Sequence, residues 1–408
     1  MTSRERVRKL IRKELTGSYC ISTGGMPNDA ISVYAYAKLL DRLGMKDRKI
    51  RVYDLLQYIP VVDADVADRL GGDFVHAERP RFRFDLHRGS WRPGMLEDGT
   101  PVYFPEEFRP ETDARGGELI RMNGEPYARR PKNGLYFDIV AKPLADAETP
   151  EDLKLIHPAA YMSEADVAAT VAGVEELYRT TDKSIILLIG GQHIEQGQRD
   201  FGFENFYCNL LEEPELMHAY FRMLTDSYLD TMERILSRCG DKVDVVWFCD
   251  DLGTQNSLQM SLPTFRSLIK PYKKEMFDYI HQNHPDTAVL YHSCGAVFNA
   301  IPDFIEMGAD MLNPVQISAA GMDPEKLVKA YGRDIIFWGG GLDTQSMKPE
   351  DTVQDILDRA SRLLDVFAAG GNYVFTQVHN FQADTDPAKI EAFYGMARDR
   401  RKVLEGLL

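Results

Sequence analysis

The chain has 408 residues, of which 44% are hydrophobic, and this length can bury one large α/β core or two ordinary ones. Lysine and arginine number 48 against 63 aspartate and glutamate, so the formal charge of -15 argues against a nucleic-acid partner. The five cysteines are scattered without CxxC spacing, which argues against a disulfide framework. The longest apolar runs are too short to span a membrane, and the first residues form a charged helix rather than a signal peptide. We therefore expect a cytoplasmic protein.

Eight short β-type runs recur along the chain, each followed by a polar turn and then by a helical pattern. They lie at 18–25, 72–78, 184–191, 243–251, 287–295, 309–316, 334–341 and 372–380. Helical patterns between them include 263–283 and 353–371, the second closed by a glycine pair where a C-cap is expected. Eight strands alternating with helices predict a parallel sheet closed into a (β/α)8 TIM barrel.

The segment 79–140 breaks this rhythm. It is rich in arginine, proline and glycine and has the pattern of loops and hairpins. We interpret it as an insertion after the second strand, within a single domain that covers 1–408.

Polar residues follow the apolar runs at the ends where the active site of a (β/α)8 barrel lies. They are Thr23, His76 with Glu78, Gln192 with His193 and Glu195, Cys249 with Asp250 and Asp251, His292 with Cys294, Asn313 with Gln316, Asp343 with Gln345, and His379 with Gln382 and Asp384. A lone histidine or cysteine at a strand end is more often a packed core residue than a ligand. The joint pattern is therefore what indicates a site.

His292 and Cys294 end the fifth run and, being two residues apart in an extended strand, project to the same face. His379 ends the eighth run, which closes next to the first in a barrel. A catalytic Zn²⁺ takes three protein ligands and keeps one position open, so these three residues form a candidate zinc site. Strands five and eight are not neighbours, so the ligands must reach across the barrel mouth. Cys249, Glu195 or Asp343 could replace one of them.

Asp250 and Asp251 stand together at the end of the fourth run. Alternation sends only one of them inward, and the other then caps the following loop. An inward carboxylate can bind a substrate cation or act as a general base, and Asp343 is the third candidate for a catalytic role. The candidate substrate-binding residues are seven polar side chains near the strand ends: His76, Gln192, His193, Gln255, Asn313, Gln316 and Gln382.

The motifs "DDLGTQNSLQMSLPTFRSLIKPY", "YHSCGAV", "FWGGGLDTQ" and "YVFTQVHNFQADTDPAKIEAFY" resemble the uroporphyrinogen decarboxylase superfamily. In particular they resemble its branch of zinc-dependent, corrinoid-linked methyltransferases, over roughly residues 150–405. The resemblance implies a methyl transfer between a small methylated substrate, or a thiol, and cobalamin, assisted by zinc. No cobalamin-binding domain is recognisable in the chain, so the cobalamin would belong to a separate corrinoid protein.

His292 and Cys294 match the HxC pair of that branch, whereas His379 stands where the branch usually has a third, cysteine ligand. Uroporphyrinogen decarboxylases carry an arginine-rich loop after the first strand and an aspartate after the second. Here these places read "STGGMPNDA" and "FVHAERP", so both features are missing. The first alternative is nevertheless a decarboxylase-like carboxy-lyase, and the second is a non-catalytic barrel that binds a small molecule. A homodimer is compatible with the sequence.

Overall fold

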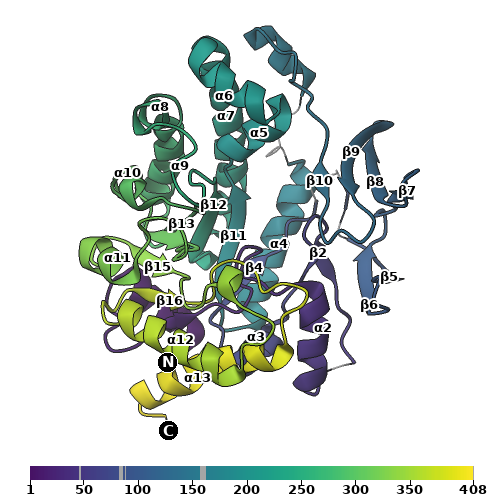
Figure 1. The fold of residues 1–408 in the computed structure, drawn as a ribbon. Helices are drawn as coiled ribbons and strands as arrows, with labels where there is room; N and C mark the ends of the chain where they lie inside the picture. Colours follow the sequence, from purple (N-terminus) through teal and green to yellow (C-terminus); the bar gives the residue numbers. More distant parts are fainter. Residues whose placement is uncertain (46, 82–85, 88, 157–161, 408) are drawn as a thin grey trace.

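The computed structural model describes residues 1–408 except 46, 82–85, 88, 157–161 and 408 (Figure 1). Eight parallel strands form one sheet in the order β1-β16-β15-β14-β13-β12-β11-β4. They are β1 (Cys20–Ile21), β4 (Phe74–Ala77), β11 (Ser184–Gly190), β12 (Val245–Cys249), β13 (Ala288–His292), β14 (Met311–Asn313), β15 (Ile336–Trp338) and β16 (Tyr373–Phe375). Each strand falls inside one of the eight predicted runs.

The two end strands of this sheet, β1 and β4, meet at Asp73. The backbone N–H of Asp73 donates to the Ile21 carbonyl over 2.8 Å, and the Ile21 N–H donates to the Asp73 carboxylate over 2.8 Å. These bonds close the sheet into a barrel, and the helices lie on its outside. The prediction of a (β/α)8 barrel is confirmed.

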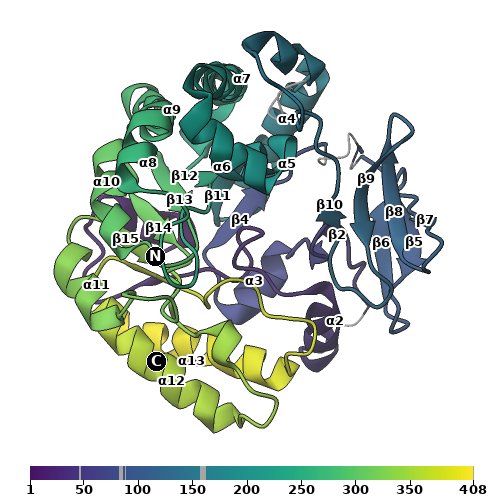
Figure 2. The same cartoon turned by 45° about the horizontal axis from the view of Figure 1, so that its top comes forward.

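The helices of the described chain surround the barrel (Figures 1 and 2). They are α1 (Ser3–Ile11), α2 (Val33–Arg42), α3 (Ala64–Leu70), α4 (Glu164–Thr180), α5 (Ile194–Phe201), α6 (Phe203–Glu212), α7 (Pro214–Cys239), α8 (Leu262–Leu268), α9 (Lys270–Asn283), α10 (Ile301–Met307), α11 (Pro324–Tyr331), α12 (Val353–Ala368) and α13 (Pro387–Leu404). The pattern at 263–283 is two helices, not one. The break falls at Ile269 because Pro271, in the first turn of α9, has no N–H to continue the bonding of α8.

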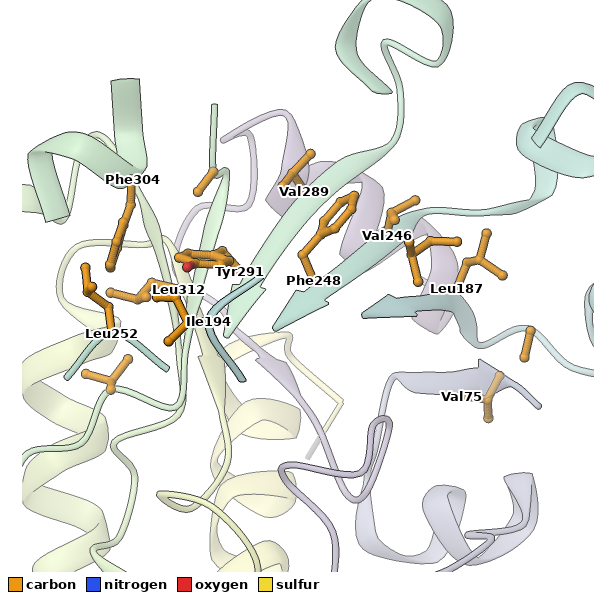
Figure 3. Close-up of a cluster of buried hydrophobic side chains, with 14 of the residues drawn as sticks. Val75, Leu187, Ile194, Val246, Phe248, Leu252, Val289, Tyr291, Phe304 and Leu312 are labelled. Atoms are coloured by element: carbon orange, nitrogen blue, oxygen red, sulfur yellow. The ribbon is translucent and has the colours of Figure 1, made fainter. Parts of the chain in front are cut away.

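Two hydrophobic cores follow from the alternation of side chains along the strands. Trp247 and Leu290 belong to the core inside the barrel, whereas Val246 and Tyr291 belong to the layer between the strands and the helices. Figure 3 shows part of the outer layer, where Val246, Phe248, Val289 and Tyr291 lie close together. Odd and even positions of one strand therefore have different environments, and this parity extends to the polar residues at the strand ends.

The segment between β4 and β11 contains antiparallel strands, as the predicted insertion of loops and hairpins requires. They are β5 (Trp91–Met95), β6 (Pro101–Pro105), β7 (Glu111–Thr112), β8 (Glu118–Met122), β9 (Glu125–Arg130) and β10 (Asp138–Ile139). Strands β5 and β6 form one hairpin, and β7 to β10 form a four-stranded sheet. In Figures 1 and 2 these strands stand to one side of the barrel, near α2 and the short strand β2 (Val52–Asp54), which pairs with β3 (Ile59–Pro60).

No disulfide joins the five cysteines, all of which the structure describes. Among the described residues, no helix has both the length and the apolar character needed to cross a membrane.

We expect Asp73→Asn to lower the free energy of unfolding by about 3–5 kcal/mol, because it removes the buried carboxylate that pairs with both Arg6 and Arg401 and leaves Arg6 with Glu405 alone. Asp73 is 0% exposed and forms ion pairs with Arg6, at 2.8 Å, and with Arg401. Urea denaturation measures the change, with Asp365→Asn in an exposed ion pair as the control that should not change it. Equal stability of both variants would contradict the role given to Asp73.

Candidate functional site

Three potential metal ligands meet at the C-terminal mouth of the barrel. One ligand atom from each of His292, Cys294 and His379 can be chosen so that all three lie within 4.8 Å of one another. His292 ends β13 and is 1% exposed, and its Nε2 lies 3.4 Å from Cys294 Sγ. The structure therefore brings together residues at the ends of β13 and β16, although these two strands are not neighbours in the sheet.

The orientation of His292 is fixed by Asn313 at the end of β14. His292 Nδ1 contacts Asn313 Oδ1, and Asn313 Nδ2 donates to the Trp338 carbonyl over 3.1 Å. Because the amide nitrogen is committed to Trp338, the amide oxygen faces the ring and Nδ1 must carry the proton. The lone pair of Nε2 then points into the cluster, where Asn28 Nδ2 contacts it at 3.3 Å.

The loop that carries Cys294 is held by two side chains from neighbouring strands. The Cys294 N–H donates to Asp251 Oδ1, and the Gly295 N–H donates to Gln316 Oε1, both over 2.8 Å. Gly295 has a φ of +94°, and a Cβ there would lie 2.4 Å from the backbone of Gly253. Glycine is needed at this position because two backbones cross without space between them.

His379 follows β16 and has a left-handed backbone, with a φ of +56°, which residues other than glycine rarely adopt. Its ring centroid lies 6.0 Å from that of His292. Burial, and then the neighbouring His292, lower the pKa of His379 to about 4. At neutral pH the ring is therefore uncharged, which is the form that binds a metal.

The pKa of the Cys294 thiol is shifted upward, in contrast to the lowered pKa of His379. Burial, followed by the negative charges of Asp251 and Glu195, raises its pKa well above the usual value. Without a cation beside it the sulfur keeps its proton, and binding of a divalent metal would release that proton.

Asp251 and Glu195 place two carboxylates beside this cluster. Asp251 Oδ1 lies 3.5 Å from His292 Nε2, and burial together with the Glu195 charge raises the pKa of Asp251 to about 6. Glu195 accepts a hydrogen bond from Cys249 Sγ over 3.1 Å and lies 3.3 Å from Arg199. The mouth therefore combines imidazole, thiol and carboxylate groups.

The two adjacent aspartates, Asp250 and Asp251, have different environments, as alternation requires. Asp251 is on the inner parity, with a side chain that is 31% exposed, whereas Asp250 is 0% exposed on the outer parity. Asp250 accepts the backbone N–H groups of 193, 194 and 195 over 2.7–2.9 Å at the start of α5 and pairs with the buried Lys273 at 2.8 Å. These contacts give Asp250 a structural role, and we leave it out of the proposed catalytic residues.

Several other predicted site residues also have structural contacts. His193 is fully buried behind the sheet, where Nε2 contacts Thr225 Oγ1 at 2.9 Å, and burial lowers its pKa well below the usual value. Asp343 caps its own turn by accepting the Gln345 N–H over 3.1 Å. His76 packs edge-on against Tyr53, with 4.7 Å between ring centroids.

The glutamines lie in networks around the mouth. Gln316 donates to Gln255 over 2.8 Å, and Gln255 donates to the Ser318 carbonyl, so this pair braces the loops. Gln382 accepts from Tyr136 OH. Gln192 accepts from Arg199 over 2.8 Å, in the network of Glu195 and Cys249.

Asn28 was missed by the sequence reasoning, and Glu195 and Cys249 were considered there only as substitute ligands. Asn28 lies in the loop after β1. Thr23 was the one polar residue that the sequence pattern singled out at the end of this strand. Its contact with His292 depends on how this loop folds back over the mouth, where Asp29 accepts from the Trp338 indole over 2.9 Å. No spacing rule in the sequence reports such a contact.

Comparison with known proteins agrees with this architecture. The family model for uroporphyrinogen decarboxylase (URO-D) matches residues 192–400, slightly more than half of the chain. The chain therefore belongs to the URO-D family. No curated protein matches the sequence. Among solved structures, a methyltransferase from Methanosarcina mazei has a similar fold over 98% of this chain and 99% of its own, with a TM-score of 0.58 and 13% identity.

Two substitutions test which of the neighbours Asp250 and Asp251 has the structural role and which faces the inside of the barrel. We expect Asp250→Asn to lower the free energy of unfolding by about 3 kcal/mol or more, because Lys273 would stay buried without a counter-ion. Asp251→Asn should change stability by less than about 1 kcal/mol, since the amide oxygen can still accept the Cys294 N–H. Chemical denaturation of both variants measures this difference, and equal losses would contradict the assignment.

Proposed function

We propose that the protein is a methyltransferase that moves a methyl group between a small methylated substrate, or a thiol, and the cobalamin of a separate corrinoid protein. The proposal includes zinc at His292, Cys294 and His379. The observation that carries it is the convergence of these three side chains within 4.8 Å at the barrel mouth.

The donor set suits zinc. Two imidazoles and one thiolate are ligands that Zn²⁺ favours, and a three-ligand set leaves a fourth position open for substrate. His292 presents Nε2 with its proton fixed on the opposite nitrogen, as metal-bound histidines usually do. His379 Nδ1 accepts the Asn380 N–H over 2.9 Å. Metal binding through either nitrogen of His379 requires this bond to be given up, because Nδ1 would then hold the metal or the proton.

Zinc bound here would act as a Lewis acid on the heteroatom that carries the methyl group, or on a substrate thiol. In demethylation the heteroatom would keep the electron pair of its broken bond to the methyl carbon and take a proton, and the reduced corrinoid of the partner protein would be the methyl acceptor. Asp251, with a raised pKa and a place beside His292, is positioned to hold that proton. Asn313 orients His292, and Asp251 and Gln316 hold the Cys294 loop.

Membership of the URO-D family supports the fold and is equally compatible with a carboxy-lyase. The loop after β1 favours methyl transfer over porphyrinogen decarboxylation, because 22–30 contains no arginine to hold substrate carboxylates and instead brings Asn28 to His292. The similar fold of the M. mazei methyltransferase is consistent with this choice.

We expect the untagged protein to bind about one zinc ion per chain, and His292→Ala and Cys294→Ala to lose it, because each removes one of three ligands. Elemental analysis of the purified proteins measures the content. Cys208→Ala is the matched control, since Cys208 is an exposed thiol elsewhere. Full zinc occupancy in both ligand variants would contradict the assigned site.

Methyl transfer is tested with chemically reduced cobalamin in place of the corrinoid partner. We expect the zinc-loaded protein to form methylcobalamin from at least one member of a panel of methoxyarenes, methylamines and methyl thioethers, or to methylate a thiol in the reverse direction. The visible spectrum of the corrinoid records the change, and Cys294→Ala should abolish it. Absence of transfer in both directions, together with CO₂ release from a porphyrinogen, would favour the decarboxylase instead, and absence of any turnover would favour a binding barrel.

A further inference from the structure

Three polar atoms surround Nε2 of His292, and two of them belong to residues outside the proposed ligand set. Asn28 Nδ2 lies 3.3 Å from this nitrogen and Cys294 Sγ lies 3.4 Å from it. Asp251 Oδ1 lies 3.5 Å from it. Asn28 and Asp251 are therefore the two polar side chains beside the place where a cation on His292 and Cys294 would meet its substrate.

The hydrogen bonds of His292 decide which atom of the Asn28 amide faces the cluster. Asn313 Nδ2 donates to the Trp338 carbonyl, so Asn313 Oδ1 accepts from His292 Nδ1. Nε2 is then an acceptor, and the Asn28 atom that contacts it must be the amide nitrogen. Asn28 therefore brings a neutral N–H donor to the cluster.

The loop that carries Asn28 is held firmly just after that residue. Asp29 is 0% exposed and accepts from the Trp338 indole over 2.9 Å. The N–H of the following residue donates over 2.9 Å to Asn380 Oδ1, and Asn380 is the neighbour of His379. The loop is thus tied both to the end of β15 and to the residues that follow β16, and these contacts keep Asn28 beside the cluster.

Metal binding would change the partner of the Asn28 amide. A cation on Nε2 takes the lone pair that Asn28 contacts, and in the described chain this nitrogen is the one acceptor within hydrogen-bond distance of Asn28 Nδ2. A substrate atom at the open position can then accept from the freed N–H. An oxygen accepts such a bond well, a sulfur accepts it weakly, and a quaternary nitrogen has no lone pair for it.

We propose that Asn28 is a substrate-binding residue that donates a hydrogen bond to the leaving oxygen, so that the methylated substrate is a methyl ether. When the bond between the methyl carbon and this oxygen breaks, the oxygen keeps the electron pair and the methyl group passes to the reduced corrinoid of the partner protein. The Asn28 N–H stabilises the negative charge that develops on the oxygen and keeps its own proton. The inference rests on the proposed function and adds the class of the leaving atom to it.

Binding of demethylated products to the cobalt-loaded, full-length protein tests this role without turnover. Phenol and thiophenol are the probes, because they are the demethylated forms of an aryl methyl ether and an aryl methyl thioether. Co²⁺ takes the place of zinc, and its visible absorption records the binding of each probe in oxygen-free buffer. We expect Asn28→Ala to weaken phenol at least tenfold, which corresponds to about 1.4 kcal/mol, and thiophenol less than twofold.

Two further variants control for shape and for the substitution itself. Asn28→Leu keeps the approximate shape of the side chain without its donor, and it should weaken phenol as much as Asn28→Ala does. Asn256→Ala makes the same change at an exposed position in the loop after β12, and both affinities should stay within twofold.

The outcomes separate this inference from the proposed function. Phenol that does not bind the cobalt-loaded parent, phenol affinity that is unchanged in both Asn28 variants, or equal weakening of phenol and thiophenol would overturn the role of Asn28 and leave the metal site standing. A parent protein that takes up no cobalt, or that lacks the sulfur-to-cobalt absorption expected from Cys294, would overturn the proposed function and this inference with it.

Discussion

The site depends on the register between three neighbouring strands. Cys249 of β12 pairs with His292 of β13, and His292 pairs with Asn313 of β14, so the three residues stand in one row at the barrel mouth. Residues two further along stay on the same face, which adds Asp251 and Cys294 to the inner side. A slip of one residue would turn His292 outward and bring Asp250 inward, and neither the metal cluster nor the cap of α5 would then form.

The electrostatics of the mouth are suited to a divalent cation. Asp251 and Glu195 lie close enough for the charge of Glu195 to raise the pKa of Asp251, in surroundings where burial already disfavours charge. Burial, and then the same two carboxylates, raise the pKa of Cys294 and keep its thiol protonated. A cation among these groups would relieve the repulsion and stabilise the thiolate, so ligand chemistry and charge favour the same occupant.

Much of this arrangement could be predicted from the sequence because a (β/α)8 barrel has strong periodic signals. The eight strands, the inserted hairpins and the grouping of His292, Cys294 and His379 follow from apolar runs, polar strand ends and the family motifs. Alternation also limited Asp250 and Asp251 to one inward residue, but choosing between them required knowing which face of β12 is the inner one. For His193, alternation gave no orientation. Gly190 and Gly191 end β11 with left-handed backbones, so the alternation of side chains between the two faces cannot be followed through them to His193.

The contacts made by loops could not be predicted in this way. Asn28, Gln316 and Glu195 reach the site from loops or helix starts whose paths depend on tertiary packing. Gln316 and Glu195 were candidate site residues, but their contacts with the Cys294 loop and with Cys249 could not be read from the sequence. Such contacts depend on long-range packing, which leaves no periodic pattern in the sequence from which they could be predicted.

The central claim is that His292, Cys294 and His379 hold zinc together, and X-ray absorption at the zinc edge of the loaded protein tests it most directly. The account predicts one sulfur at about 2.3 Å and nitrogen or oxygen neighbours at about 2.0–2.1 Å, with imidazole scattering from two histidines. The sulfur signal should disappear in Cys294→Ala. A zinc environment of oxygen and nitrogen alone in the parent protein, or a spectrum that does not change in Cys294→Ala, would contradict the account.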